Sequence, residues 1–387
     1  MRTAALLAAG DELLSGTRRE GNCAFMAGRL NALGWVVPRI EVVSDEVSSI
    51  VEALGRWVGN ADVVVLSGGL GPTHDDRTRA AVAEYLLSRP GARVDSVPNP
   101  VGTAPGIFFE AGGTRFWSLP GVPGEYRVMA EVHILPALDR DPLYECRSVS
   151  VVGLPETRVV ALIPEVISNE CLHVSVLPSS GVVELVLKGD RSAVEAAERL
   201  VRGRMPDDVL PSGCANLPEA VLSTGVRHGL TVCCAESCTG GMVGAALTEI
   251  PGSSAVFAGS AVVYSNEAKT RLLGVDASVI ESRGAVSREC AEGMAVGAVT
   301  LYGGGREENT LSVSVTGVAG PDGGSDDKPI GTVWFAVARG TSIVGAFERR
   351  FAGDRADVRE RSVKAALAAL WRGMNGCRTG GEHGHIV

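Results

Sequence analysis

In the C-terminal half of the chain, the fold is decided by the stretch Leu230-Thr231-Val232-Cys233-Cys234-Ala235-Glu236-Ser237-Cys238-Thr239-Gly240-Gly241. Residues 230–235 form a short apolar run typical of a buried β-strand. Ser237 and Thr239 follow this run, at the turn where a helix is expected to begin. The helix is predicted from apolar residues at helical spacing, namely Met242, Val243, Ala246, Leu247 and Ile250.

Two interpretations of this turn remain open. Gly240 and Gly241 are expected to leave the first helical N–H groups uncovered, and such donors suit a phosphate or the oxyanion of an acyl-transfer step. A serine or threonine N-cap beside a tight glycine turn explains the same residues without any chemistry. Ser237 is therefore a candidate nucleophile that needs a base and an anion site nearby.

Composition limits the class of protein. A chain of 387 residues with 45% hydrophobic and 21% charged residues is globular and long enough for two or three domains. Its net charge of −9 argues against nucleic acid or an anionic membrane as partner. We find no apolar run of membrane-spanning length and no signal peptide, so we expect a cytoplasmic protein. Nine scattered cysteines indicate no disulfide framework.

Residues 1–142 alternate between strands and helices, which predicts a parallel sheet covered on both faces, a three-layer α/β domain. A hairpin is expected at residues 108–109 and 115–119, joined by Ala111-Gly112-Gly113. The predicted strands are 3–9, 36–43 and 62–67, and the predicted helices are 22–33, 45–58 and 76–87.

The rest of the chain divides into a small α+β module, an α/β domain and a flexible tail, at residues 143–213, 214–376 and 377–387. The middle module is predicted from strands 147–152, 172–177 and 182–187 and helices 156–163 and 191–204. In the α/β domain the last helix, 354–374, begins at an aspartate N-cap and ends before the glycine-rich tail.

Lys269 is a candidate base for Ser237. It follows the predicted strand 260–264 and lies in the first turn of a helix, with Asn266 as the expected N-cap. A cation in the first turn opposes the helix dipole, which lowers the pKa of a lysine, and an apolar environment lowers it further. A serine paired with a lysine base hydrolyses amides in known enzymes, and the hydroxyl of Tyr264 is a candidate proton relay. A solvated helix residue and a half-buried strand end explain Lys269 and Tyr264 equally simply.

A glycine-rich loop supplies the third element. Residues 316–325, Thr-Gly-Val-Ala-Gly-Pro-Asp-Gly-Gly-Ser, follow the predicted strand 311–315. Such glycines let backbone N–H groups converge on an anion, although a flexible hairpin loop has the same composition. Three polar strand ends in one α/β domain are typical of a site at the carboxyl edge of a sheet.

Together, residues 235–241, 264–269, 284–287, 316–324, 328–334 and 353–355 closely resemble the C-terminal domain of the CinA family, the nicotinamide-nucleotide amidase. The resemblance implies hydrolysis of the carboxamide of nicotinamide mononucleotide to nicotinic acid mononucleotide and ammonia, without a cofactor. Ser237 is then the nucleophile, and Lys269 and Tyr264 move the proton. Expected substrate-binding residues are Thr239, Gly240, Gly241, Asn266, Gly317, Gly320, Gly323, Gly324 and Arg355. Cys238 is a competing nucleophile with no histidine near it in sequence.

The N-terminal part carries a second set of motifs, Gly10-Asp11-Glu12-Leu13-Leu14-Ser15-Gly16 and Ser67-Gly68-Gly69-Leu70-Gly71-Pro72-Thr73-His74-Asp75-Asp76. They resemble the N-terminal domain of the same family, which is related to molybdopterin-binding proteins and associated with metal-dependent ADP-ribose pyrophosphatase activity. A divalent metal is the candidate cofactor there, with Asp75 and Asp76 as ligands. The candidate nucleotide-binding residues are Asp11, Asn22, Gly68, Gly69, Gly71, Thr73, Asn99, Thr103 and Glu125.

This chain departs from that pattern. Only residues 79–98 separate the Asp75-Asp76-Arg77-Thr78 motif from Asn99, fewer than in full-length relatives, and Ser88-Arg89-Pro90-Gly91 has the composition of a shortened segment. Arg19-Glu20-Gly21-Asn22 replaces the usual acidic-Thr-Asn approach. The middle module resembles a KH-like domain only loosely, and we infer no RNA binding from it. A nucleotide-binding regulatory protein remains the alternative to an enzyme, and we expect a homodimer.

Overall fold

The computed structural model describes residues 2–71, 73, 76–87, 93–179 and 181–376. The chain forms two compact units. The first is the chain up to Arg147 with Glu170–His173 and Leu187–Ala196, and the second is Ser148–Asn169 and Val174–Val186 with the chain from Ala197 onward. The residues of the predicted middle module are divided between these two units. The three-domain division therefore stays a prediction, and the tail 377–387 lies outside the described residues.

The first unit contains a six-stranded sheet, and it confirms the expected α/β class. Four neighbouring strands are parallel, and β5 and β4 are added antiparallel through hairpins. Gly112 and Gly113 both have positive φ at the β5–β6 turn, as the predicted hairpin requires. The sheet order is β2 (Ile40–Val43), β1 (Ala4–Ala9), β3 (Val63–Ser67), β6 (Thr114–Leu119), β5 (Gly106–Ala111) and β4 (Val94–Val97).

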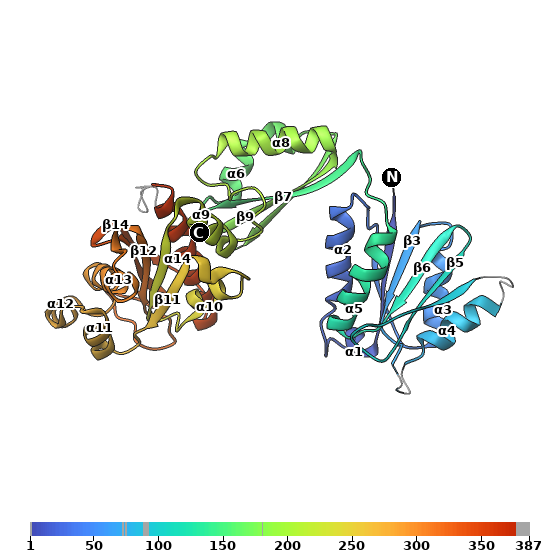
Figure 1. The fold of residues 1–387 in the computed structure, drawn as a ribbon, viewed down its shortest axis with the longest axis horizontal. Coiled ribbons are helices and arrows are strands. Elements are labelled where there is room, and N and C mark those ends of the chain that lie inside the picture. The colour runs from blue at the N-terminus through green and yellow to red at the C-terminus, as the bar shows by residue number, and fades with distance from the viewer. Residues whose placement is uncertain (1, 72, 74–75, 88–92, 180, 377–387) are drawn as a thin grey trace. The chain divides into compact units, whose positions relative to one another are not determined.

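Helices cover both faces of this sheet, as Figure 1 shows. Alternate residues of β1 point to opposite faces, so Leu6 packs with α2 and α5 while Leu7 packs with α3 and α4. The predicted helix at 76–87 begins two residues later, at Thr78. The carboxylate of Asp76 accepts a hydrogen bond from the backbone N–H of Thr73. The helices are α1 (Asp11–Leu14), α2 (Asn22–Ala32), α3 (Val47–Trp57), α4 (Thr78–Leu87) and α5 (Pro123–Met129).

The segment 143–213 forms the expected α+β pattern. Its three-stranded sheet has the order β7 (Tyr144–Val152), β9 (Val182–Asp190) and β8 (Leu172–Ser179). The helix predicted over 156–163 ends one residue earlier because Pro164 starts a new turn. The helices here are α6 (Glu156–Leu162), α7 (Pro164–Ile167) and α8 (Arg191–Arg204).

The second unit contains a five-stranded sheet with a core on each face. Alternation along β10 places Val232 and Cys234 in one core and Cys233 and Ala235 in the other. The sheet order is β11 (Phe257–Val262), β10 (Thr231–Glu236), β12 (Thr310–Gly317), β13 (Thr332–Arg339) and β14 (Ser342–Arg350), with the first three parallel. One face packs against α9 (Leu217–His228), α10 (Met242–Thr248) and α14 (Arg355–Met374), and the other against α11 (Asn266–Leu273), α12 (Ala277–Arg283) and α13 (Arg288–Tyr302).

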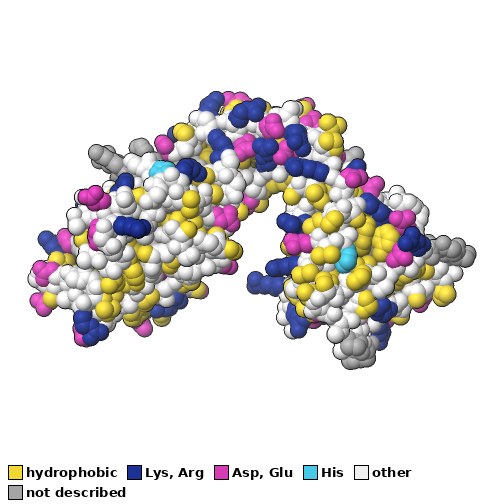
Figure 2. Space-filling model, in the orientation of Figure 1, with side chains coloured by type: hydrophobic (Ala, Val, Ile, Leu, Met, Phe, Trp, Pro, Cys, Tyr) yellow, Lys and Arg dark blue, Asp and Glu magenta, His cyan; other side chains and the backbone are white. Residues whose placement is uncertain are grey.

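The surface in view carries lysine, arginine and carboxylate side chains of both signs in mixed order (Figure 2). Among the described residues, no helix is long and apolar enough to cross a membrane.

Helix α14 begins at the predicted aspartate N-cap. The Asp354 carboxylate accepts hydrogen bonds from the backbone N–H groups of Ala356 and Asp357, at 2.8 and 3.0 Å, and the Asp357 carboxylate accepts from the Asp354 backbone. Asp354→Ala removes this capping box, so we expect the free energy of unfolding to fall by about 1 kcal/mol in urea denaturation. Asp207→Ala, at an exposed position outside the helix, is the control. Equal stability of the two variants would contradict the assigned cap.

Candidate active site

Three parallel strands bring the predicted site residues of the second unit to one edge of the sheet. Ser237 follows β10, Lys269 is reached through the segment after β11, and Gly317 ends β12. β10 pairs in parallel with both β11 and β12, so the carboxyl ends of all three strands lie together.

Lys269 and Ser237 are in direct contact. The Nζ atom of Lys269 lies 3.0 Å from the Oγ atom of Ser237, although the residues are 32 positions apart in the chain. The same nitrogen donates to the backbone carbonyls of Val263 and Tyr264, at 2.9 and 3.2 Å. Lys269 is only 1% exposed, so this lysine amine sits inside the protein beside a serine hydroxyl.

The surroundings of Lys269 favour the neutral amine. Burial lowers the pKa of Lys269, and the thiols of Cys290 and Cys238 oppose this shift only in part. No described carboxylate forms an ion pair with its Nζ. A neutral amine has two N–H donors and one lone pair. The two carbonyls can take both donors, which leaves the lone pair to accept the proton of the Ser237 hydroxyl.

Glu236, which sequence reasoning passed over, organises the turn that carries Ser237. Its side chain is fully buried, and its carboxylate accepts four hydrogen bonds of 2.7 to 3.0 Å. The donors are the backbone N–H groups of Gly241, Val243 and Gly244 and the hydroxyl of Ser260. An acidic residue at the strand end, directly before a glycine-rich helix start, was the signal available in the sequence.

This carboxylate corrects one prediction about the turn. The first helical N–H groups were expected to be uncovered, but that of Gly241 donates to Glu236 and that of Gly240 donates to the Ser237 carbonyl at 3.1 Å. Gly240 and Gly241 thus shape the turn, with φ of 62° and 97°, and do not offer free donors to an oxyanion. Thr239 lies fully buried beside them.

Arg359 of α14 is a second residue that sequence reasoning missed. Its Nε atom donates to the Cys238 carbonyl at 3.1 Å, and its Nη2 atom donates to the Thr239 carbonyl at 3.0 Å. This two-pronged contact fixes the orientation of two successive peptide groups directly after Ser237. Because Arg359 lies about 120 residues further along the chain, no local sequence pattern reveals the contact.

Tyr264 occupies a different place from the one predicted. Its side chain is 64% exposed, and its hydroxyl accepts a hydrogen bond from Arg355 Nη2 at 3.3 Å. Only its backbone carbonyl contacts Lys269. The proton relay expected from the Tyr264 hydroxyl is therefore not formed in this geometry, because alternation along the extended chain turns Val263 inward and Tyr264 outward.

The predicted anion-binding residues are brought together in part. Arg355 donates to the Gly320 carbonyl at 2.7 Å as well as to Tyr264, so it joins the glycine-rich loop to the segment after β11. Asn266 is exposed at the start of α11, but the N-cap is Ser265, whose hydroxyl accepts from the Ala268 N–H. Gly323 and Gly324 lie exposed in the same loop, and Gly317 packs closely against β13.

Cys238 is a poor competitor for the role of nucleophile. It is buried, and burial raises the pKa of its thiol to about 11. The reactive thiolate is therefore scarce near neutral pH.

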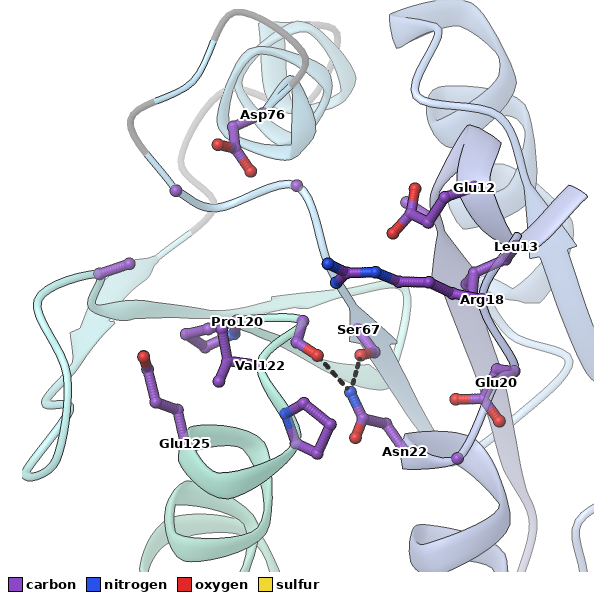
Figure 3. Close-up of a pocket in the computed structure, with 18 of the residues that line it drawn as sticks. Glu12, Leu13, Arg18, Glu20, Asn22, Ser67, Asp76, Pro120, Val122 and Glu125 are labelled. Carbon is purple, nitrogen blue, oxygen red and sulfur yellow. Dashed lines mark hydrogen bonds between the residues drawn. The ribbon is translucent and has the colours of Figure 1, made fainter. Parts of the chain in front are cut away.

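In the first unit, a separate cavity of about 370 Å³ collects many of the predicted N-terminal residues (Figure 3). The predicted residues that line it are Asn22, Gly68, Gly69, Gly71, Asp76, Thr103 and Glu125. Asp11, Thr73 and Asn99 lie behind this lining and hold it through hydrogen bonds to Asp45, Asp76 and Glu125. Lining residues to which sequence reasoning assigned no role include Glu12, Arg18, Arg19, Asp45 and Ser67.

The predicted metal ligands receive no support from this cavity. Asp75 lies outside the described residues, and the carboxylate of Asp76 accepts hydrogen bonds from the backbone and hydroxyl of Thr73. No three described His, Cys, Asp or Glu residues are grouped so that they can hold a metal ion. We therefore derive no chemical step through a metal.

Both halves of the chain match the models of known protein families. Residues 215–374 match the family model described as "CinA C-terminal domain", and residues 5–140 match "Probable molybdopterin binding domain". A CinA-like protein of Geobacter sulfurreducens is 37% identical over 411 residues, covering 95% of this chain and 97% of the relative. A CinA-like protein of Fervidobacterium nodosum is 34% identical over 414 residues, covering 98% of this chain and all of the relative. The competence/damage inducible protein CihA of Agrobacterium tumefaciens, a solved structure, is 42% identical over 40% of this chain and 91% of its own, with a TM-score of 0.37. Both alignments to the CinA-like proteins are longer than this chain, so the relatives carry residues that it lacks.

Substitution of Glu236 tests whether its carboxylate holds the turn between β10 and α10. In Glu236→Gln one carboxylate oxygen becomes an amide nitrogen, which opposes a backbone N–H because three of the four partners can only donate. We expect the free energy of unfolding to fall by about 1 to 3 kcal/mol, measured by urea denaturation. Glu249→Gln is the matched control, because Glu249 is an exposed glutamate directly after α10, the helix that begins at this turn. We expect it to change the free energy of unfolding by less than about 0.5 kcal/mol. A Glu236→Gln variant as stable as this control would show that the carboxylate does not hold the turn.

Proposed function

This chain belongs to the CinA family, and we propose that its second unit hydrolyses the carboxamide of nicotinamide mononucleotide to nicotinic acid mononucleotide and ammonia. The observation that carries the proposal is the buried Lys269 amine 3.0 Å from the Ser237 hydroxyl, without a counter-ion among the described residues. A lysine held in this way has no stabilising role that an apolar side chain would not fill at lower desolvation cost. General base catalysis gives its burial a reason.

The proposed reaction proceeds in two halves. The neutral Lys269 amine accepts the hydroxyl proton of Ser237 while Oγ attacks the amide carbon, and the resulting ammonium donates a proton to the departing nitrogen. The C–N bond breaks, ammonia leaves and the nicotinoyl group remains as an ester on Ser237. Water, deprotonated by the same amine, attacks this ester and releases the carboxylate, with the proton returned to Ser237.

The substrate's phosphate is assigned to the polar groups around the β12 end. Arg355 is the cation there, and its contact with the Gly320 carbonyl places its guanidinium at the glycine-rich loop. We propose that Tyr264, whose exposed ring lies beside Arg355, contributes to substrate binding and not to proton transfer. Arg359 is proposed to act as a positioning residue, because both of its hydrogen bonds go to the turn that follows Ser237.

A regulatory protein that binds nucleotides without catalysis is the competing function. The first unit alone does not discriminate between the two, since its cavity suits a ligand in either case. The buried Ser237–Lys269 contact favours the enzyme, because binding a nucleotide requires no buried lysine next to a serine.

The nucleophile is tested by release of ammonia from nicotinamide mononucleotide. We expect Ser237→Ala and Lys269→Met to lower kcat/KM by at least about a thousandfold, since each removes one partner of the proton transfer. Cys238→Ala is the neighbouring control and should retain most of the activity. Loss of activity in the Cys238 variant with retention in the Ser237 variant would reverse the assignment. A folded wild-type protein that binds the mononucleotide but releases no ammonia would favour the regulatory function.

The pH profile tests Lys269 separately. The neutral amine is the active form, and burial lowers its pKa below the ordinary lysine value of 10.5. We therefore expect kcat/KM to rise with pH and to level off above a pKa below 10.5. Residual activity of Lys269→Met should lack this rise. A wild-type profile that falls as pH increases from about 7 to about 10 would contradict a lysine base.

A further inference from the structure

Two backbone donors in the turn that carries Ser237 have no oxygen acceptor. The Gly240 N–H donates to the Ser237 carbonyl at 3.1 Å, which is the i to i+3 hydrogen bond of a β-turn whose first residue is the nucleophile. The N–H of Ser237 itself donates to the Val315 carbonyl at 2.9 Å. The two central N–H groups of the turn, those of Cys238 and Thr239, donate to no oxygen of the described residues. The neutral Cys238 thiol near them is only a weak acceptor.

Arg359 fixes the direction of one of these donors. The peptide bonds of the turn are trans, so the C=O and N–H of each peptide group point in opposite directions. The Cys238 carbonyl shares its peptide group with the Thr239 N–H, and it accepts a hydrogen bond from Arg359 Nε at 3.1 Å. The Thr239 N–H therefore points away from Arg359. Because the Thr239 carbonyl also accepts from Arg359 Nη2, at 3.0 Å, this orientation is fixed on both sides of Thr239.

The hydroxyl of Thr239 is a third unmatched donor in the same turn. Thr239 is fully buried, and its Oγ1 atom has no hydrogen-bond partner among the described residues. A buried hydroxyl without a partner lowers stability, so a valine of nearly the same shape would suit a purely structural position better. A partner that forms only during the reaction gives this hydroxyl a reason.

Burial does not separate Thr239 from the reacting atoms. Ser237 is only 7% exposed and Lys269 only 1%, so the nucleophile and its base are themselves buried. A carbonyl group that Ser237 attacks has to enter among buried groups, and the donors of Thr239 lie two residues from that serine. Donors that are fixed in place and shielded from water stabilise a developing charge more strongly than water does.

We propose that Thr239 is a further catalytic residue of the second unit, an inference that rests on the proposed function. Its backbone N–H and hydroxyl, together with the Cys238 N–H, form the oxyanion hole. These donors replace the N–H groups of Gly240 and Gly241, which are engaged within the protein. Arg359 is the positioning residue that directs the Thr239 N–H.

The proposed donors act on the carbonyl oxygen of the amide. As Ser237 Oγ bonds to the amide carbon, the electron pair of the C=O π bond moves onto the oxygen, where the donors stabilise the negative charge. The pair then returns to the carbon–oxygen bond while the C–N bond breaks. The nitrogen leaves with the proton that Lys269 took from Ser237.

The experiment compares Thr239→Val with Thr239→Ser in the full chain, measured by ammonia release from nicotinamide mononucleotide. Valine keeps the backbone N–H and removes the hydroxyl. We expect kcat to fall by about a hundredfold with little change in KM, because this donor acts in the transition state. Thr239→Ser restores a hydroxyl and should recover most of the lost kcat.

The backbone donor is tested by placing the α-hydroxy acid analogue of threonine at position 239, which exchanges the N–H for an ester oxygen. We expect kcat to fall by about a hundredfold here as well. The same exchange at Ala255 is the control, since the Ala255 N–H donates to the Gly252 carbonyl outside the site. This control should keep the kcat of the wild type.

Thr224→Val is the matched control for the hydroxyl. Thr224 is a fully buried threonine of α9, and its Oγ1 atom also has no partner among the described residues. The next residue, Gly225, accepts from the N–H of Leu230 directly before β10, so Thr224 lies toward the amino edge of the sheet, away from Ser237. Its kcat and KM should equal those of the wild type. Neither valine variant should unfold at a lower urea concentration, because each removes an unpartnered hydroxyl.

Hydrolysis of p-nitrophenyl acetate separates this inference from the proposed substrate. Transfer of its acetyl group to Ser237 passes through the same kind of oxyanion and releases p-nitrophenolate, without a carboxamide or a nucleotide. Thr239→Val should release p-nitrophenolate more slowly than Thr224→Val. This difference is expected even for a wild type that leaves nicotinamide mononucleotide intact, a result that would contradict the proposed substrate alone.

Three results would overturn the inference. The first is equal activity of Thr239→Val and Thr224→Val toward p-nitrophenyl acetate. The second is a wild type that releases p-nitrophenolate no faster than Ser237→Ala, which would leave no acyl transfer for an oxyanion hole to serve. The third is a Thr239→Val variant that loses stability together with activity, since the hydroxyl would then have a structural role.

Discussion

The burial of one lysine amine without a counter-ion among the described residues is the constraint on which the candidate active site depends. An isolated ammonium inside a protein is costly, and the protein lowers that cost when the amine is neutral. The two carbonyls of Val263 and Tyr264 accept hydrogen bonds from Lys269 in either state, so they hold the nitrogen in place while its third position faces Ser237. The position of the Lys269 amine and its lowered pKa therefore have the same origin, which is the packing of the segment between β11 and α11.

The serine is held by a separate system of contacts. Glu236 binds the donors of the helix start and the hydroxyl of Ser260, and Arg359 binds the carbonyls of the turn. These two charged residues contact opposite kinds of backbone group, N–H on one side and C=O on the other. The turn therefore cannot rotate its peptide groups without losing hydrogen bonds to a charged side chain, which are among the stronger ones in proteins. In the proposed reaction, a nucleophile and a base that are both held in place lower the entropic cost of the attack.

Several features were predictable from the sequence because they depend on local chemistry. The strand before Ser237 follows from its apolar run, the Asp354 cap from the preference of aspartate for the N-cap position, and the Gly112-Gly113 hairpin from glycine at positive φ. Features set by distant contacts were not predictable in this way. Arg359 is brought to the turn by the packing of α14, and the exposure of Tyr264 depends on which side chain faces the core. The error over the Gly241 N–H arose because a buried glutamate at a strand end gives no periodic signal.

The two units differ in whether their site cations are buried or exposed, and this difference decides what those cations can do. In the second unit the cation of Lys269 is buried, surrounded by neutral acceptors and biased toward losing its proton. In the first unit Arg18 and Arg19 are exposed, and a guanidinium keeps its proton at any physiological pH. A group that titrates can move protons, whereas a group that stays charged can only bind and orient an anion. In the proposed reaction, proton transfer is therefore assigned to the Ser237–Lys269 pair. The cavity beside Asn22 holds both kinds of charged group, with two guanidinium groups and five carboxylates in its lining.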